Sequence, residues 1–265
     1  MTNEIPQIHG PVLVTGGTGT LGRHVVPRLQ SAGRTVRTLS RHTPESPIGD
    51  EHSVADLLKG EGIESAFAGI DTIVHLAGGP KGDDDVATNL VRAARVAGVR
   101  HIVYISVIAA DSVPLGYFRS KFAAEQVIEK ADTASTTLRA AQFHDLTLGA
   151  VRAMGRMPVV PAPGGVRWQP VDARDVAERL VELALAEPAG RVADLAGPAI
   201  MSLPDLTRTY LQARGKRRPF VPIRVPGKLG RVYRAGENLT QDGADVGKRT
   251  WEDFLTEQVG TRRKQ

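Results

Sequence analysis

This chain of 265 residues contains no cysteine, which excludes a disulfide scaffold, a thiolate nucleophile and zinc held by cysteine. Aromatic residues make up only 5% and are not interleaved with basic ones, so we expect no nucleic-acid platform. The longest nearly uncharged apolar run, residues 102–110, is too short to cross a bilayer, and the first residues show no export signal. We therefore expect a soluble, cytoplasmic, globular protein that does not bind membranes.

Charge is distributed unevenly along the chain. From residue 196 onward there are 14 basic and 7 acidic side chains, and the basic ones cluster at Arg214–Arg218 and Arg262–Lys264. A positive C-terminal part is able to attract an acidic substrate, a phosphate-bearing cofactor or nucleic acid. The favoured interpretation is a solvated basic surface that ends in a frayed tail.

Short apolar strands alternate with helical patterns in the first half of the chain. Predicted strands cover residues 12–14, 35–39, 53–55, 72–76, 101–106 and 136–139. Predicted helices cover residues 21–32, 63–67, 86–97 and 115–130, and glycines follow the first and third of these. This alternation predicts βαβ units and a parallel sheet with helices on both faces.

After about residue 140 the alternation becomes less regular. Residues 157–165 are predicted to form a proline- and glycine-rich loop, and residues 172–186 an amphipathic helix. Ser202, Pro204 and Asp205 have the spacing of a capped helix start. We expect a nucleotide-binding domain over residues 1–195. Residues 196–265 are predicted to be a small lobe that completes the substrate pocket without folding independently.

A glycine-rich turn joins the first strand to the first helix. Its glycines at positions 16, 19 and 22 are spaced G-x-x-G-x-x-G. Without β-carbons, such a turn brings backbone N–H groups and the positive end of a helix close to a pyrophosphate. The strand before and the helix after it support dinucleotide binding. The residues expected to contact the cofactor here are Gly16, Thr18, Gly19, Thr20 and Leu21.

The end of the second strand indicates which dinucleotide binds. NAD sites usually place Asp or Glu there, whereas this chain has Ser40 and Arg41 and no acid before Glu45. Arg41 would attract a 2′-phosphate, so we predict NADP in preference to NAD. Two further segments follow later strands and are expected to line the cofactor site: Asp56-Leu57 and Leu76-Ala77-Gly78.

Tyr117 and Lys121 lie in the predicted helix after the fifth strand. Their i, i+4 spacing places both side chains on one helical face. An ammonium beside a phenol stabilises the phenolate and thereby favours acid–base work by the tyrosine. Ser106, at the end of the fifth strand, is placed to hydrogen-bond a substrate oxygen.

With these motifs the chain resembles the extended or atypical branch of the short-chain dehydrogenase/reductase superfamily and the related NmrA-like proteins. The resemblance covers about residues 8–200, including the TGGTGxxG turn, the YxxxK pair and the segment Val171–Val176. It implies a Rossmann-type, doubly wound α/β fold. It also implies that Tyr117 is the acid/base, that Lys121 is its partner and a ribose ligand, that Tyr117 and Lys121 both contact the cofactor, and that Ser106 orients the substrate.

The resemblance leaves two roles open. Ser112 competes with Ser106 for the orienting role, because only 11 positions separate Ser106 from Tyr117. Asn89, on the preceding helix, is either structural or part of a proton relay. The strand-four segment reads Leu-Ala-Gly-Gly and lacks the Asn-Ala-Gly of the short-type enzymes.

Other polar residues have simpler explanations. His144 beside Asp145 is interpreted as a loop histidine with a local hydrogen bond, the alternative being a substrate contact. Asp83, Asp84 and Asp85 are interpreted as a solvated helix start and not as a metal site. Trp168 and Trp251 are expected to be packing residues, although Trp168 is also a candidate for the pocket edge.

Three functions fit these patterns. The first is an NADP-dependent oxidoreductase acting on a small carbonyl or alcohol, with Tyr117 as acid/base. The second is an NmrA-like sensor that binds the dinucleotide and a protein partner without turnover. The third is an epimerase or isomerase of the same fold with tightly held NAD. The sequence leaves the substrate open and is compatible with an oligomer.

Overall fold

The computed structural model describes residues 10–46, 48–79, 81–240 and 243–260. The chain divides into two compact units. Unit 1 comprises Met1–Ser106, Ser120–Leu138 and Ala177–Val192, and unit 2 comprises Val107–Arg119, Arg139–Val176 and Ala193–Gln265. The predicted division at residue 195 is close to the last of these boundaries, at residue 193, but remains a prediction.

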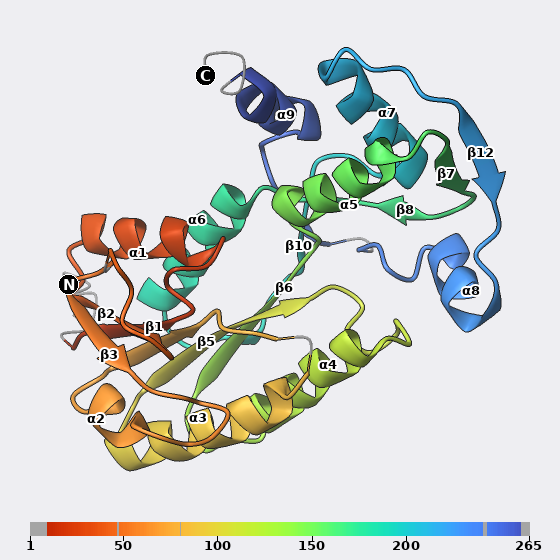
Figure 1. Ribbon diagram of the computed structural model, residues 1–265. Coiled ribbons are helices and arrows are strands. Elements are labelled where there is room, and N and C mark those ends of the chain that lie inside the picture. Colours follow the sequence, from red (N-terminus) through yellow and green to blue (C-terminus); the bar gives the residue numbers. More distant parts are fainter. Residues whose placement is uncertain (1–9, 47, 80, 241–242, 261–265) are drawn as a thin grey trace, which may run out of the picture. The chain divides into compact units, whose positions relative to one another are not determined.

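Unit 1 is built on a parallel sheet, as the alternation of strands and helices predicts (Figure 1). The strands run in the order β6-β5-β4-β1-β2-β3, and β9 pairs with β6. Their bounds are β1 (Val12–Thr15), β2 (Val36–Ser40), β3 (Glu51–Val54), β4 (Thr72–His75), β5 (His101–Val107), β6 (Ser135–Ala140) and β9 (Gly190–Arg191). The α/β, Rossmann-type parallel sheet flanked by helices is therefore confirmed.

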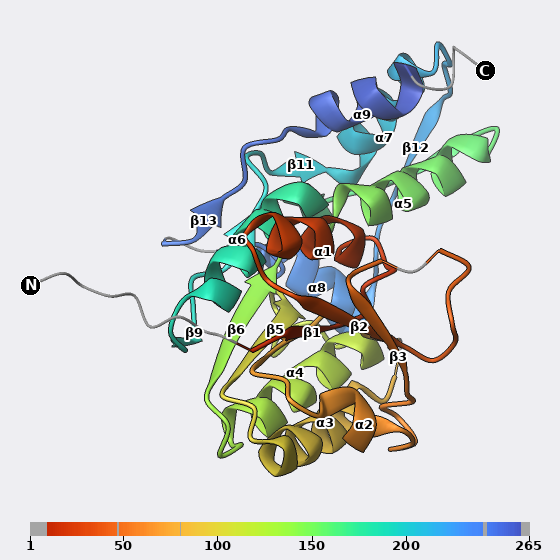
Figure 2. The same cartoon turned by 90° about the vertical axis from the view of Figure 1, so that its left-hand side faces the viewer.

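Helices cover both faces of this sheet. Figure 2 shows α1 (Gly22–Ser31) on one side of β1 and β2, and α2 (Ile63–Phe67) and α3 (Asp83–Ala97) on the other. The unit 1 parts of α4 (Gly116–Glu129) and α6 (Ala173–Leu185) complete these layers. Alternate residues of the strands enter a core with α2, α3 and α4, as Leu13, Ile73 and Ile102 do. Burial on both faces explains why β1 and most of β5 are nearly continuous apolar runs.

The register of the central strands places their carboxyl ends side by side. Thr15 of β1 is opposite Leu39 of β2 and His75 of β4, and His75 is opposite Tyr104 of β5. The loops that follow β1, β2 and β4 therefore meet at one edge of the sheet. This is the edge at which ligands bind in open parallel sheets.

Unit 2 contains smaller sheets and several helices. β10 (Leu195–Ala196) pairs with Ala140, the last residue of β6, and with β13 (Asp245–Val246). β7 (Val160–Pro163) pairs with β12 (Phe220–Ile223), and β8 (Arg167–Trp168) pairs with β11 (Met201–Ser202). Its other helices are α5 (His144–Arg156), α7 (Leu203–Ala213), α8 (Gly227–Ala235) and α9 (Trp251–Gly260). Leu148, Val151, Leu206, Trp251, Phe254 and Leu255 form its apolar core.

Unit 2 differs from the sequence prediction at several points. The predicted loop at residues 157–165 contains β7, which tolerates its prolines because it lies in a sheet of only two strands. Helices α5, α8 and α9 were not predicted from the sequence. The predicted start of α7 is confirmed, since the Asp205 N–H donates to the Ser202 hydroxyl over 3.1 Å.

None of the helices in the part of the chain that the structure describes has the length and apolar character needed to span a membrane.

Candidate functional site

The turn after β1 has a backbone that requires glycine. Gly16 has a φ of +72°, in the left-handed region, and a β-carbon on it would lie 2.9 Å from the backbone nitrogen of Ala77. A β-carbon on Gly22 would lie 2.3 Å from the carbonyl oxygen of Gly17. The turn therefore lies directly against both the end of β4 and the start of α1.

Hydrogen bonds fix this turn to β4. The Thr15 hydroxyl accepts a bond from the Ala77 N–H over 3.2 Å and lies 2.7 Å from Nδ1 of His75. Burial, with a smaller effect of the Lys121 charge, lowers the pKa of His75 to about 3. A neutral imidazole can accept the Thr15 O–H at Nδ1. The two strand ends that would flank a dinucleotide are thus held together.

The N-terminus of α1 suits a phosphate group. No side chain caps it and no acidic residue occupies its first turn. The positive end of the helix and its first N–H groups therefore face no competing carboxylate of the helix itself. Thr18 and Gly19 are exposed in the turn, and Thr20 is partly exposed. Together with Gly16, these features fit the pyrophosphate of a dinucleotide.

A pocket of about 550 Å³ lies at the carboxyl ends of β2 and β3. Arg41 and Asp56, two of the residues predicted to contact the cofactor, line it. Leu57 does not, because its side chain is buried in the core of unit 1, and Ser40 is not part of the lining either. The full lining is Arg41, His42, Val54, Ala55, Asp56, Lys59, Glu61 and Gly62.

Two charged residues of this pocket were not predicted from the sequence. Lys59 and Glu61 follow β3 in a tight turn, in which Oδ1 of Asp56 accepts the N–H groups of Leu58 and Lys59. The turn brings the basic side chains of Lys59 and Arg41 to the same pocket. Asp56, three residues before Lys59, is the kind of residue that initiates such a turn, and it was the only signal available in the sequence.

Lys121 lies in a buried polar site at the end of β4. Its Nζ is 3.0 Å from Oδ2 of Asp83 and 5.2 Å from the centroid of the Tyr104 ring, and its side chain is only 5% exposed. Gly78, a predicted cofactor contact, borders the same ammonium. The interpretation of Asp83 as solvated is wrong. Asp83 does begin α3, but this first residue of the helix is turned toward Lys121.

The predicted serine and tyrosine lie in different environments. Ser106 is buried at the end of unit 1, and its hydroxyl has no hydrogen-bond partner among the described residues. Ser112 is exposed and its hydroxyl donates to Asp111. Tyr117 is the second residue of α4 in unit 2 and is 39% exposed, and its ring lies nearly perpendicular to that of Phe118. Lys121, on the same helix, belongs to unit 1.

Asn89 has a structural role in unit 1. Its side-chain amide donates to the carbonyl oxygens of Leu57 and Leu58, over 2.8 Å and 3.3 Å. It thereby ties α3 to the turn that carries the charged residues of the pocket. Of the two roles left open by the sequence, these bonds favour the structural one.

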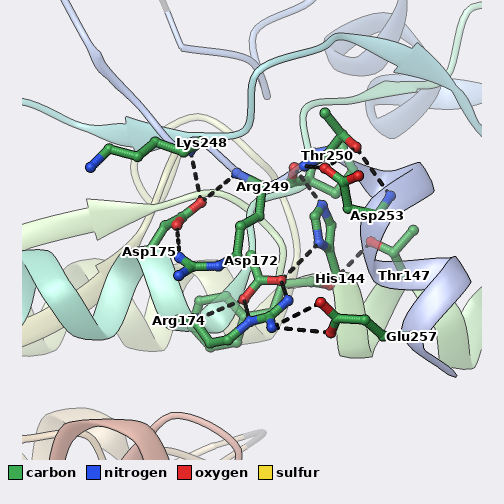
Figure 3. A network of polar contacts seen from close by, with 12 residues as sticks. His144, Thr147, Asp172, Arg174, Asp175, Lys248, Arg249, Thr250, Asp253 and Glu257 are labelled. Atoms are coloured by element: carbon green, nitrogen blue, oxygen red, sulfur yellow. Dashed lines mark hydrogen bonds and ion pairs between the residues drawn. The ribbon is translucent and has the colours of Figure 1, made fainter. Parts of the chain in front are cut away.

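His144 belongs to a polar network in unit 2 (Figure 3). It starts α5 and is fully buried, so the prediction of a loop position is wrong. Its Nδ1 lies 3.6 Å from Oδ2 of Asp172 and its Nε2 lies 3.1 Å from the carbonyl oxygen of Pro170, while Asp145 is exposed. Its ring packs on Trp251, which is buried as expected.

Asp172 is the centre of this network. Nε and Nη2 of Arg174 donate to its two carboxylate oxygens over 2.9 and 2.8 Å, and the Arg174 N–H donates over 2.8 Å. Burial by itself raises the pKa of Asp172, but the bonds from Arg174 and His144 outweigh it and hold the pKa well below its usual range. The neighbouring Asp175 pairs with Arg249 and accepts the N–H groups of Lys248 and Arg249.

The described residues contain no group of three or more His, Asp or Glu side chains arranged to hold a metal ion.

Residues 16–187 match a protein family that is described as NAD(P)H-binding. The chain belongs to this NAD(P)H-binding family. The match contains the turn after β1, the pocket at β2 and β3, and Lys121.

Curated relatives of this NAD(P)H-binding chain include reductases. It is 30% identical over 190 residues to ceramide reductase of Caulobacter vibrioides. This alignment covers 65% of this chain and 60% of that protein. It is 29% identical over 224 residues to the NAD(P)H azoreductase of Xenophilus azovorans, covering 80% of this chain and 77% of the relative. A Mycobacterium tuberculosis relative is matched over only 24% of its length. The chain thus spans less than two thirds of some of these relatives.

Solved structures share the fold. An NADPH-dependent quinone oxidoreductase from Escherichia coli, solved with NADPH, has a TM-score of 0.78 at 20% identity, covering 93% of this chain and 99% of that one. The triphenylmethane reductase of Citrobacter sp., solved with NADP(H), has a TM-score of 0.76 at 20% identity, covering 94% and 99%. The Rossmann-type fold expected from the resemblance is thereby confirmed.

Proposed function

We propose that this protein is an NADP-dependent oxidoreductase that reduces a small carbonyl compound or oxidises the corresponding alcohol, with Tyr117 as the acid/base. The observation that carries the proposal is the buried ammonium of Lys121 at the carboxyl end of β4, one helical turn after Tyr117 on α4. A buried ammonium at this edge of the sheet has a direct use in binding a dinucleotide and in proton transfer.

The residues that would hold the cofactor lie at the ends of β1, β2 and β4. Gly16, Thr18, Gly19, Thr20 and Leu21 bind the pyrophosphate through backbone N–H groups, and Leu76, Ala77 and Gly78 line the path to the nicotinamide. A bound nicotinamide supplies the hydride to a carbonyl carbon or accepts it from an alcohol.

Arg41 and Lys59 favour NADP over NAD. Both line the pocket at the ends of β2 and β3, where a ribose 2′-phosphate would meet two positive charges. The same pocket contains Asp56 and Glu61, but Asp56 is engaged in the turn at Leu58 and Lys59. Arg41 directly follows β2, in the position from which NAD enzymes present a carboxylate to the ribose.

Proton transfer is assigned to the chain's own side chains. In the reductive direction the Tyr117 hydroxyl donates a proton to the carbonyl oxygen, and in the oxidative direction the phenolate takes it back. The Lys121 ammonium stabilises the phenolate and binds the ribose. Ser106 hydrogen-bonds the substrate oxygen, and its buried hydroxyl, without a partner among the described residues, is suited to this. Ser112 is less suited, because its hydroxyl is bonded to Asp111.

The named relatives favour the reductive direction. Ceramide reductase, NAD(P)H azoreductase and the quinone oxidoreductase are reductases or oxidoreductases by name. Their named substrates differ widely, so the substrate of this chain is proposed only as a small molecule with a reducible carbonyl or quinone group.

The proposal is tested by substrate-dependent oxidation of NADPH and NADH, followed at 340 nm with a panel of aldehydes, ketones and quinones. In Tyr117→Phe we expect turnover to fall by about 100-fold or more, because general acid–base catalysis contributes about 10²–10⁴-fold. The Kd for NADPH should stay within about twofold, since the phenylalanine keeps the ring that would contact the cofactor and lacks only the hydroxyl assigned to proton transfer.

Tyr210→Phe is the matched control, because Tyr210 packs against the apolar core of unit 2. It should keep wild-type turnover. Wild-type turnover in Tyr117→Phe would refute the assignment of the acid/base. NADPH binding without oxidation by any substrate of the panel would favour the dinucleotide-sensing protein, and copurified NAD would favour the epimerase.

A further inference from the structure

Asp83 makes three contacts that connect the loop after β4 to α4. Its Oδ1 accepts the N–H of Gly79 over 2.9 Å, and its own N–H donates to the Ser120 hydroxyl over 3.0 Å. Its Oδ2 lies 3.0 Å from Nζ of Lys121. One buried residue thus joins the segment that follows β4, the start of α3 and the lysine of α4.

The ion pair is a buried one. The side chains of Asp83 and Lys121 are 4% and 5% exposed, and the ammonium also lies over the face of the Tyr104 ring. An ammonium removed from water needs a compensating charge to stay protonated and in place. Among the described residues, Asp83 is the carboxylate that lies within ion-pair distance of Lys121. By contrast, Asp84 is partly exposed and Asp85 is exposed.

The loop after β4 is shaped to admit this ammonium. A β-carbon on Gly78 would lie 2.8 Å from Nζ of Lys121 and 3.4 Å from Oδ2 of Asp83. The backbone of Gly78 is outside the left-handed region, so its conformation does not require glycine. Glycine is needed at this position because the ammonium of Lys121 fills the space that a β-carbon would occupy.

We propose that Asp83 is a positioning residue for Lys121, which holds the ammonium against Gly78 at the carboxyl end of β4 so that it can bind the dinucleotide. The proposal rests on the assignment of Lys121 to the cofactor in the proposed function. Oδ2 of Asp83 lies within ion-pair distance of the ammonium but accepts no hydrogen bond from the described residues, so the ammonium keeps N–H donors for the ribose hydroxyls. Gly78 is part of the same arrangement, because any side chain there would displace the ammonium.

The first test observes Lys121 directly in the protein without cofactor. The chain contains eight lysines, so ¹³C labelling of their ε-carbons gives a simple spectrum, and loss of one signal in Lys121→Met identifies Lys121. The Tyr104 ring should shift this signal away from those of the exposed lysines. We expect Asp83→Asn and Gly78→Ala to move it toward them, whereas Asp84→Asn leaves it unchanged. Gly78→Ala keeps both charges and serves if Asp83→Asn folds poorly.

The second test is a double-mutant cycle on the affinity for NADPH. Asp83→Asn should raise the Kd by about tenfold in the wild-type background, the effect of losing one well-placed contact. In the Lys121→Met background it should change the Kd by less than twofold, because there is no ammonium left to position. A residue that only stabilises the fold would raise the Kd equally in both backgrounds.

The outcomes separate this inference from the proposed function. An unchanged Lys121 signal in Asp83→Asn and Gly78→Ala, or equal effects of Asp83→Asn in the two backgrounds, would overturn the positioning role. Full turnover in Tyr117→Phe would remove the acid/base assignment and would leave the cycle on NADPH affinity unaffected.

Discussion

Replacement of Asp172 by asparagine tests the network of unit 2 at its centre (Figure 3). The substitution keeps the shape of the side chain and one oxygen that can accept hydrogen bonds. It removes the negative charge that faces Arg174 and His144 and replaces one acceptor oxygen by an amide nitrogen. Arg174 keeps its ion pair with Glu257, at 3.0 Å.

The expected loss of stability follows from the burial of the two partners. Breaking a fully buried ion pair costs about 3–5 kcal/mol. Asp172 is 3% exposed, but Arg174 is 25% exposed and retains Glu257, so we expect a smaller loss of about 2 kcal/mol. For a chain of this size, that corresponds to a fall of about 4–8 °C in the thermal midpoint.

The loss of stability in Asp172→Asn should become smaller as the pH is lowered. The pKa of folded Asp172 is held well below the value of about 3.9 that applies to the unfolded chain. The carboxylate therefore contributes its full stabilisation above about pH 4, and the contribution is lost as the pH falls further. The difference in thermal midpoint between the wild type and Asp172→Asn should be constant from pH 5 to pH 8 and should become smaller toward pH 3.

Thermal unfolding followed by circular dichroism measures both effects. The control is Asp132→Asn, because Asp132 also pairs with an arginine, Arg95, but the two side chains are 79% and 74% exposed. An exposed pair contributes less than about 1 kcal/mol. Equal midpoints for the two variants at pH 7, or a difference that does not narrow by pH 3, would refute this account of Asp172.

The remaining predictions concern the cofactor and one buried histidine. Arg41→Ala should raise the Kd for NADPH by about 10–100-fold, the effect of one charge-assisted hydrogen bond, and should leave the Kd for NADH within about twofold. Isothermal titration against Arg95→Ala checks this, and equal losses for both cofactors would contradict it. His75 should stay neutral in NMR titrations down to about pH 4, because burial lowers its pKa to about 3. The unfolded chain binds that proton from about pH 6.5 downward, whereas the folded chain does not. The free energy of unfolding should therefore fall by up to about 1.4 kcal/mol for each pH unit below about 6.5. Protonation of folded His75 near pH 6.5 would contradict the burial argument.

The sheet of unit 1 was predictable because its central strands can be recognised from short apolar segments of the sequence alone. β1 and β5 are buried on both faces and are therefore apolar along their length, as residues 12–14 and 102–105 show. The ends of α1 and α3 were predictable as well, because Gly33 follows the first and Gly98 caps the second. The pocket at β2 and β3 follows from the same register, since residues after neighbouring parallel strands meet at one edge.

Unit 2 was predicted less well because its elements depend on distant partners. β7 consists of Val160–Pro163 and has two prolines, which locally favour a loop. It becomes a strand by pairing with β12, about 60 residues later in the chain. The N-cap of α5 is Phe143, whose side chain makes no capping hydrogen bond, so no capping pattern marks the start of the helix. What fixes it is burial of Leu148 and Val151 against α7 and α9.

The misinterpretation of Asp83 shows what the sequence does not reveal about the start of a packed helix. Three successive carboxylates at a helix start are expected to be solvated, because each interacts favourably with the helix dipole in water. Successive residues of a helix point about 100° apart, however, so in a helix that packs on a sheet one of three adjacent side chains faces inward. Which one does so is decided by how α3 lies on the sheet, and in this structure it is the residue facing Lys121. An acid cluster at the start of a packed helix, followed along the chain by a lysine on the next helix, therefore favours one buried ion pair as well as a solvated surface.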